Sequence, residues 1–124
     1  CAPYANAFDA GVDHLVDTAV TPTIAEGIAS SKPTRVKEVL GAVRGSGGSV
    51  VAVSEDEIVV ALGEFARKGL YVEPTSAAAG AGLTRLLRAG LIKPEESTVV
   101  VLTGTGLKSS ERIGQLLGVR AREL

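Results

Sequence analysis

The sequence predicts an α/β fold of three layers, in which a small, mostly parallel sheet is flanked by helices. From Ser49 onward, short β-branched or aliphatic runs alternate with helical segments, and glycine or proline separates them. This alternation is typical of parallel strands joined by helices. Aromatic residues make up only 3% of the 124 residues. The core must therefore be built from Val, Leu, Ile and Ala, which suits helices packed on a parallel sheet.

Two helices are expected before the first strand. Tyr4 to Ala10 is a short helical candidate that ends near Gly11. Pro33 suits the first turn of a second helix. In that helix, aliphatic residues recur at helical spacing and charged residues occupy the other face. Residues 45–48, which read Gly-Ser-Gly-Gly, are expected to end it.

Three strands are expected in the remainder of the chain, at residues 49–53, 70–72 and 98–102. Each is a short run rich in Val, Leu or Ile that helical segments separate from the next. A sheet of three strands is small against the roughly four to six strands of a usual sheet. We therefore expect further strands of this sheet to lie in sequence outside the chain.

The helices between these strands have clear start signals. Ser54 is a good N-cap, and Glu57 three residues later completes a capping box. The helix that begins there should extend to about Lys68, because Gly69 follows. Two more helices are expected, from Pro74 to Gly90 and from Ser109 or Ser110 through Leu117.

Charge and composition exclude several classes of function. The net charge is -1 with both signs scattered, so no basic stripe is available to bind nucleic acid or an anionic membrane. The apolar runs of the sequence, such as Val99 to Leu102, are far too short to span a bilayer. The single cysteine, Cys1, cannot form an internal disulfide, and the only histidine, His14, has no neighbours at metal-ligand spacing. No metal site is expected, and the cytoplasm is the default compartment.

Three polar segments follow predicted strands, residues 54–55, 73–76 and 103–108, and the last two are the candidates for a binding site. Ligands of open parallel sheets bind beyond the carboxyl ends of the strands. Residues 73–76, Glu-Pro-Thr-Ser, and residues 103–108, Thr-Gly-Thr-Gly-Leu-Lys, both fall there. The hydroxyl of Thr103 can donate or accept a hydrogen bond, and the two glycines let a flat ligand approach the backbone. Both segments are equally compatible with a plain helix start and a plain strand-to-helix turn.

These same segments resemble the C-terminal signature of threonine synthases. The resemblance rests on Glu73–Ala78, which reads Glu-Pro-Thr-Ser-Ala-Ala, followed by Val99–Lys108, which reads Val-Val-Val-Leu-Thr-Gly-Thr-Gly-Leu-Lys. Thr23–Ile28 and Ser54–Ile58 are similar to stretches that threonine synthases share with serine/threonine dehydratases. Dehydratases usually carry Gly-Ala after Glu-Pro and a Ser-Gly-Gly-Asn type of turn later, so the sequence follows the synthases at both places. It departs from them at Thr105, where synthases often have His.

The resemblance implies a fold-type II pyridoxal-phosphate enzyme, a lyase that converts O-phospho-L-homoserine and water into L-threonine and phosphate. Residues 1–124 would form the C-terminal part of its large domain. The resemblance assigns Thr103 to the pyridine nitrogen of the cofactor and places Gly104, Glu73 and Ser76 near the same ring. The family's Schiff-base lysine and its phosphate-binding loop belong to motifs that this sequence lacks, and Lys108 is not assigned that role. The chain therefore contributes no catalytic residue of its own, and we expect it to be inactive in isolation.

Two alternatives remain open at this point. The chain could be part of a related enzyme, such as a serine/threonine dehydratase or a cysteate synthase. It could also be a small, non-enzymatic α/β domain for ligand binding or protein interaction, which predicts a monomer with a fully covered sheet. A part of a larger enzyme predicts exposed apolar strands instead. The resemblance implies that the full-length enzyme is a homo-oligomer.

Overall fold

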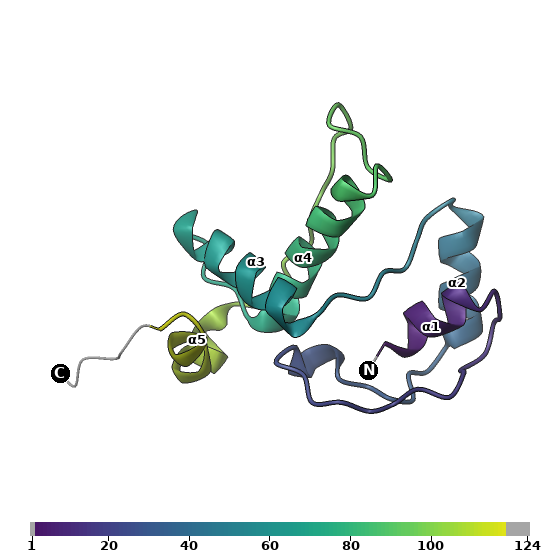
Figure 1. Cartoon of the computed structure of the whole chain (residues 1–124), viewed down its shortest axis with the longest axis horizontal. Helices are drawn as coiled ribbons and strands as arrows, with labels where there is room; N and C mark the ends of the chain where they lie inside the picture. The colour runs from purple at the N-terminus through teal and green to yellow at the C-terminus, as the bar shows by residue number, and fades with distance from the viewer. Residues whose placement is uncertain (1, 119–124) are drawn as a thin grey trace. The chain divides into compact units, whose positions relative to one another are not determined.

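The computed structural model describes residues 2–118, which fold into two compact units. The N-terminal unit comprises the described residues up to 23 together with residues 28–52, and the C-terminal unit comprises residues 24–27 and those from 53 onward. The helices of the described chain, shown in Figure 1, are α1 (Pro3–Asp9), α2 (Val36–Gly45), α3 (Glu55–Arg67), α4 (Pro74–Arg88) and α5 (Ser110–Leu116), with two 3-10 turns, η1 (Glu26–Ile28) and η2 (Gly106–Ser109).

The prediction of a mostly parallel sheet flanked by helices is wrong for the described residues. Residues 49–53, 70–72 and 98–102 lie between the helices as predicted, but among residues 2–118 they form no strand. The described chain has one isolated β-bridge, between Val72 and Thr105, and it is antiparallel. A strand exists only when a neighbour accepts and donates its backbone hydrogen bonds, and a β-branched run cannot supply that neighbour by itself.

The third of these segments exposes apolar side chains to solvent. Val99 is 88% exposed and Val101 is 68% exposed. Such exposed fractions are unusual for a run of β-branched residues, because a strand of this composition in a parallel sheet is usually buried on both faces. The apolar side chains of this segment are thus left uncovered by the described residues.

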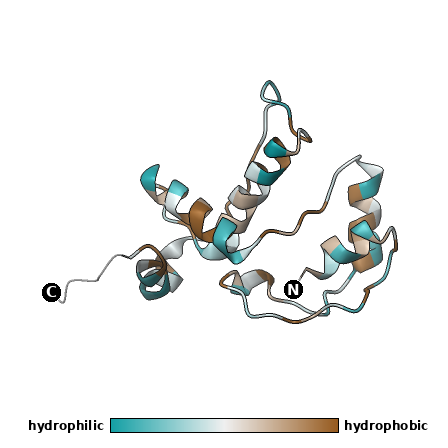
Figure 2. Cartoon of the chain, in the orientation of Figure 1, coloured by the Kyte–Doolittle hydropathy of each residue, from teal (hydrophilic) through white to brown (hydrophobic). Residues whose placement is uncertain are grey.

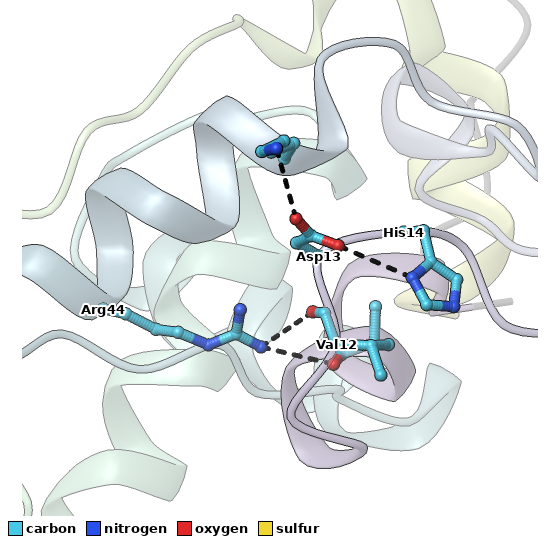
Figure 3. A network of polar contacts seen from close by, with 6 residues as sticks. Val12, Asp13, His14 and Arg44 are labelled. Atoms are coloured by element: carbon cyan, nitrogen blue, oxygen red, sulfur yellow. Dashed lines mark hydrogen bonds and ion pairs between the residues drawn. The ribbon is translucent and has the colours of Figure 1, made fainter.

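Within the N-terminal unit, Arg44 near the end of α2 ties this helix to α1 and the turn that follows it. Its guanidinium donates to the carbonyl oxygen of Val12 at 2.9 Å and to that of Ala7 at 3.4 Å, as Figure 3 shows in part. It also lies over the ring of Phe8, 5.3 Å from the centroid. One cation therefore satisfies carbonyls near the C-terminal end of α1 and holds an aromatic contact as well.

His14 lies in this unit on an exposed turn, beside Asp13 (Figure 3). Its Nδ1 is 3.5 Å from an Asp13 carboxylate oxygen, and Lys37 approaches the other oxygen at 3.6 Å. The hydrogen bond with His14, and then the charge of Lys37, lower the pKa of Asp13. Among the residues that the structure describes, no group of acidic, His and Cys side chains could hold a metal ion. Cys1 lies outside the described residues.

The core of the C-terminal unit lies mainly between α3 and α4. Ile58 and Leu62 of α3 are each 2% exposed, and Figure 2 shows the hydrophobic residues in the middle of this helix. The small residues of α4 allow the two helices to approach closely. At Gly80 a Cβ would come within 2.6 Å of the Phe65 ring, so only glycine fits there without movement. The buried cluster comprises Ala25, Ile58, Ala61, Leu62, Val72, Ala77, Ala81 and Ile113.

The predicted helices are confirmed, with one shifted boundary. The second begins at Val36 instead of Pro33, because Arg35 adopts a left-handed conformation with φ of 60°. The start of α3 carries the predicted capping box, in which Ser54 Oγ accepts from the Glu57 N–H at 3.2 Å and the Glu57 carboxylate accepts from the Ser54 N–H at 2.7 Å. No helix in residues 2–118 is long and apolar enough to cross a membrane.

Replacing Ser54 by Ala is expected to lower the free energy of unfolding by about 1 kcal/mol, because an N-terminal amide of α3 loses its acceptor. Urea denaturation followed by circular dichroism measures the change. Ser54→Asp is the matched control, since an aspartate oxygen can accept the same hydrogen bond. Equal losses in both variants would contradict the capping role.

The Glu57 half of the capping box should depend on pH. The hydrogen bond from the Ser54 backbone lowers the pKa of Glu57 below its usual value. A carboxyl whose pKa is depressed by folding stabilises the folded state above its unfolded-state pKa, and that contribution disappears as the pH falls through the folded-state pKa. The stability difference between the wild type and Glu57→Ala should therefore be larger at pH 7 than at pH 3. A difference that grows towards acid pH would refute this assignment.

Candidate functional site

Two backbone hydrogen bonds join the residues just before α4 to the turn after residues 98–102, and together they form the antiparallel bridge between Val72 and Thr105. In the first, the Glu73 N–H donates to the carbonyl oxygen of Gly104 at 3.2 Å. The Gly106 N–H donates to the carbonyl oxygen of Tyr71 at 3.0 Å. These contacts bring the two predicted site segments together, although the sheet that was expected to align them is absent from the described residues.

Ser76, in the first turn of α4, is the centre of the resulting cluster. Its side chain is buried, with an exposed fraction of 1%. Its Oγ accepts a hydrogen bond from the Gly104 N–H at 2.9 Å, and it lies 3.2 Å from both the Gly104 carbonyl oxygen and the Thr103 hydroxyl. The Thr103 residue itself is exposed. The cluster therefore pairs the hydroxyl of an exposed residue, Thr103, with the hydroxyl of a buried one, Ser76.

Glu73 completes the cluster with a carboxylate. Its backbone caps α4, since its carbonyl oxygen accepts from the Ala77 N–H at 3.1 Å, but its side chain makes no capping hydrogen bond. The carboxyl group lies directly against Gly104, where the Cβ of any other residue would overlap it. The four residues predicted for the site are thus linked: Ser76 contacts Thr103 and Gly104, and Glu73 contacts Gly104.

Gly104→Ala is expected to displace the Glu73 carboxylate with little effect on stability. Gly104 does not adopt a positive φ, so alanine suits its backbone conformation. The new methyl group overlaps the mobile end of the Glu73 side chain, which can rotate away. We expect the free energy of unfolding to change by less than about 1 kcal/mol. A crystal structure of the variant, or the carboxyl ¹³C signal of Glu73, would report the displacement. An unmoved carboxylate would contradict the contact.

A cavity of about 630 Å³ adjoins this cluster, and Glu73 and Pro74 line it. The lining of the cavity carries both signs of charge. Positive charge comes from Lys108 and Arg112, and negative charge comes from Glu26, Glu73 and Glu111. A lining of mixed sign favours a ligand that itself carries both charges over a simple anion or cation.

A loop on one side of the cavity is fixed to both helices of the core. The Gly27 N–H donates to the Thr75 hydroxyl at 3.1 Å, and the Ile24 N–H donates to the Glu55 carboxylate at 2.8 Å. A Cβ at Gly27 would lie only 2.8 Å from the Thr75 oxygen, so the glycine permits this close approach. The two hydrogen bonds position residues 24–27 beside the first turns of α3 and α4.

Sequence reasoning missed the participation of Thr75 and Arg112 and assigned no role to Lys108. Thr75 was treated with the helix start, yet its hydroxyl anchors Gly27. Lys108 lies in η2 and Arg112 in α5, so their spacing in the sequence did not indicate that both line one cavity. η2 and α5 turn both towards the cavity.

The residues of the cluster fit one edge of a flat heteroaromatic ring. Thr103 is an exposed residue whose hydroxyl can donate to a ring nitrogen, and Gly104 beside it has no side chain to obstruct the approach of a ring. Pyridoxal phosphate has such a nitrogen at the edge of its ring, so the donor set is compatible with this part of that cofactor.

Comparison with known proteins points to the same chemistry. The family model described as "Pyridoxal-phosphate dependent enzyme" matches residues 1–104. The chain is 38% identical over 110 residues to the threonine synthase of Methanocaldococcus jannaschii, which covers 88% of this chain and 27% of that protein. It is 34% identical over 112 residues to the threonine synthase of Methanosarcina acetivorans, which covers 90% of this chain and 28% of that protein.

A bacterial threonine synthase is similar as well. That of Halalkalibacterium halodurans is 38% identical over 87 residues, or 69% of this chain and 25% of that protein. The chain thus spans about a quarter of the length of these relatives. Because the family model covers most of the sequence, the chain belongs to the family of pyridoxal-phosphate dependent enzymes, whose cofactor is pyridoxal phosphate.

Proposed function

We propose that the chain is the C-terminal part of the large domain of a threonine synthase, which converts O-phospho-L-homoserine and water into L-threonine and phosphate. The observation that carries this proposal is the hydrogen-bonded cluster of Ser76, Thr103 and Gly104 with Glu73 against it. The similarity to threonine synthases from archaea and bacteria supports it. We propose further that the complete enzyme is cytoplasmic and homo-oligomeric.

Thr103 is the residue that we assign to the ring nitrogen of the cofactor. When bound, pyridoxal phosphate supplies an electron sink for carbanion chemistry. A neutral hydroxyl donates a hydrogen bond to the ring nitrogen but does not hold it protonated, as a carboxylate partner would. Thr103 therefore moderates the electron sink. Gly104 keeps the approach to the ring free of side chains, and the Glu73 carboxylate lies at the border between this cluster and the cavity.

The cavity beside Glu73 is our candidate for part of the substrate path. O-phospho-L-homoserine carries an ammonium, a carboxylate and a phosphate, so it is a ligand of mixed charge. The lining offers Lys108 and Arg112 as partners for its anionic groups and three carboxylates as partners for its ammonium. This complementarity supports the assignment of the substrate class.

The isolated chain is proposed to be inactive. Its sequence lacks the motifs that carry the Schiff-base lysine and the phosphate-binding loop of the family. The cluster described above supplies contacts to one edge of the ring only, and a single neutral hydrogen bond contributes about 0.5–1.5 kcal/mol. That is too little for tight cofactor binding, since each 1.4 kcal/mol changes an affinity by only about tenfold.

The direct test is phosphate release from O-phospho-L-homoserine, with pyridoxal phosphate present, by this chain and by the complete enzyme that contains it. We expect the complete enzyme to release phosphate and threonine in equal amounts and the 124-residue chain to release neither. A complete enzyme that forms a keto acid from serine or threonine would instead be a dehydratase. One that forms cysteate would be a cysteate synthase. If neither the chain nor the complete enzyme has activity on an amino acid, the interaction-domain alternative gains support.

A further inference from the structure

We infer that Ser76 is a positioning residue that makes the Thr103 hydroxyl a hydrogen-bond donor towards the cofactor ring. The inference rests on the proposed function, because it concerns the same ring contact. The inferred role of Ser76 is indirect, because this residue acts on Thr103 and does not itself touch the ring. Ser76 has an exposed fraction of 1%, and its hydroxyl lies beside that of Thr103.

The hydroxyl proton of Ser76 can be donated to one of two acceptors. A serine hydroxyl has one proton to donate and two lone pairs that accept. One lone pair accepts from the Gly104 N–H at 2.9 Å. The proton has two acceptors at the same distance, the Gly104 carbonyl oxygen and the Thr103 hydroxyl oxygen, both at 3.2 Å. The Gly104 carbonyl already accepts from the Glu73 N–H at 3.2 Å, so it remains satisfied without Ser76.

The direction of this one proton decides what Thr103 presents to a ligand. If Thr103 donates to Ser76, its outward side offers only lone pairs. If Ser76 donates to Thr103, the proton of Thr103 is free to point outwards. An unprotonated ring nitrogen has a lone pair and no proton, so only the second arrangement forms a hydrogen bond with it. A bound ring would therefore favour one arrangement of the hydroxyl protons. In it, the Gly104 N–H donates to Ser76, Ser76 donates to Thr103, and Thr103 donates to the ring nitrogen.

Burial makes Ser76 different from the hydroxyl next to it. Water cannot replace the Ser76 hydroxyl at an exposed fraction of 1%, so its loss leaves the Gly104 N–H and the Thr103 oxygen without this partner. The neighbouring Thr75 hydroxyl is engaged elsewhere, since it accepts from the Gly27 N–H at 3.1 Å. Thr75 therefore provides a matched control in which a hydroxyl is removed from the same helical turn.

The test uses the complete enzyme loaded with pyridoxal phosphate that carries ¹⁵N at the ring nitrogen, and its readout is the ¹⁵N chemical shift of that nitrogen. Thr103→Val should move the signal towards that of a pyridine without a hydrogen bond. Ser76→Ala should move it in the same direction by a smaller amount and should weaken cofactor binding by about three- to tenfold. Thr75→Val should leave the signal unchanged. In the double variant, Ser76→Ala should add nothing to the shift that Thr103→Val causes.

The outcomes separate the inference from the proposal on which it rests. If Thr103→Val moves the signal and Ser76→Ala does not, the positioning role of Ser76 is wrong and the ring contact stands. If Thr103→Val leaves the signal in place, the ring contact itself is wrong, and the inference falls with it. Should Ser76→Ala fail to fold, Ser76→Cys nearly preserves the side-chain volume with a weak donor and acceptor. It should move the signal as alanine would, and an unmoved signal would overturn the inference.

Discussion

Thr103→Val in the complete enzyme is expected to lower kcat/KM for O-phospho-L-homoserine by about tenfold to a hundredfold. The substitution keeps the shape of the side chain and removes its hydroxyl, which lies 3.2 Å from Ser76 Oγ on a residue that is exposed as a whole. A hydrogen bond to a group on which charge develops is worth about 1.5–3 kcal/mol, which corresponds to this range of rates. Initial-rate measurements of phosphate release determine the change.

Thr105→Val is the matched control for this prediction. Thr105 is exposed and lies two residues further along the same turn, and its hydroxyl donates weakly to the Tyr71 carbonyl oxygen at 3.4 Å. The same change from hydroxyl to methyl should leave kcat/KM within about twofold, since an exposed, long hydrogen bond contributes little. Equal losses in the two variants would show that the turn as a whole, and not the Thr103 hydroxyl, supports the reaction.

The helices of the protein were predictable because their signals are local. Ser54 and Glu57 form the capping box within four consecutive residues, and Pro74 begins α4 as expected. The sheet was not predictable in this way, since strand pairing depends on backbone groups elsewhere in the chain. Residues 98–102 have the composition of a buried strand, yet Val99 and Val101 are among the most exposed apolar residues described.

The four residues predicted for the site lie close together in the structure, and their role remains a prediction; the surroundings of these residues were not predicted. The prediction used the carboxyl ends of parallel strands, and the segments meet through the two hydrogen bonds of the antiparallel bridge between Val72 and Thr105. The parallel sheet, which was the reason for predicting the site, is thus absent from the described residues. The two segments nevertheless lie together. The cavity depends on side chains from η2 and α5 facing the first turn of α4, and spacing within one segment does not reveal such a packing.

Leu62→Ala is expected to lower the free energy of unfolding of the C-terminal unit by about 2–5 kcal/mol, because it empties a site in the core between α3 and α4. Leu62 is only 2% exposed. A loss of this size is a large fraction of the stability of a domain this small. Urea denaturation followed by circular dichroism measures it. The first turn of α4 carries Ser76, so the variant should also weaken the cluster, visible as faster hydrogen exchange at the Gly104 amide.

Val60→Ala on the same helix separates core packing from helix propensity. Val60 is 60% exposed, and its replacement by a better helix former should change the free energy of unfolding by less than about 0.5 kcal/mol. Hydrogen exchange at Gly104 should then equal that of the wild type. If both variants lose the same stability, α3 does not pack on α4 through Leu62. If Leu62→Ala is destabilised while Gly104 exchange is unchanged, the turn at residues 103–106 is held by contacts other than those to α4.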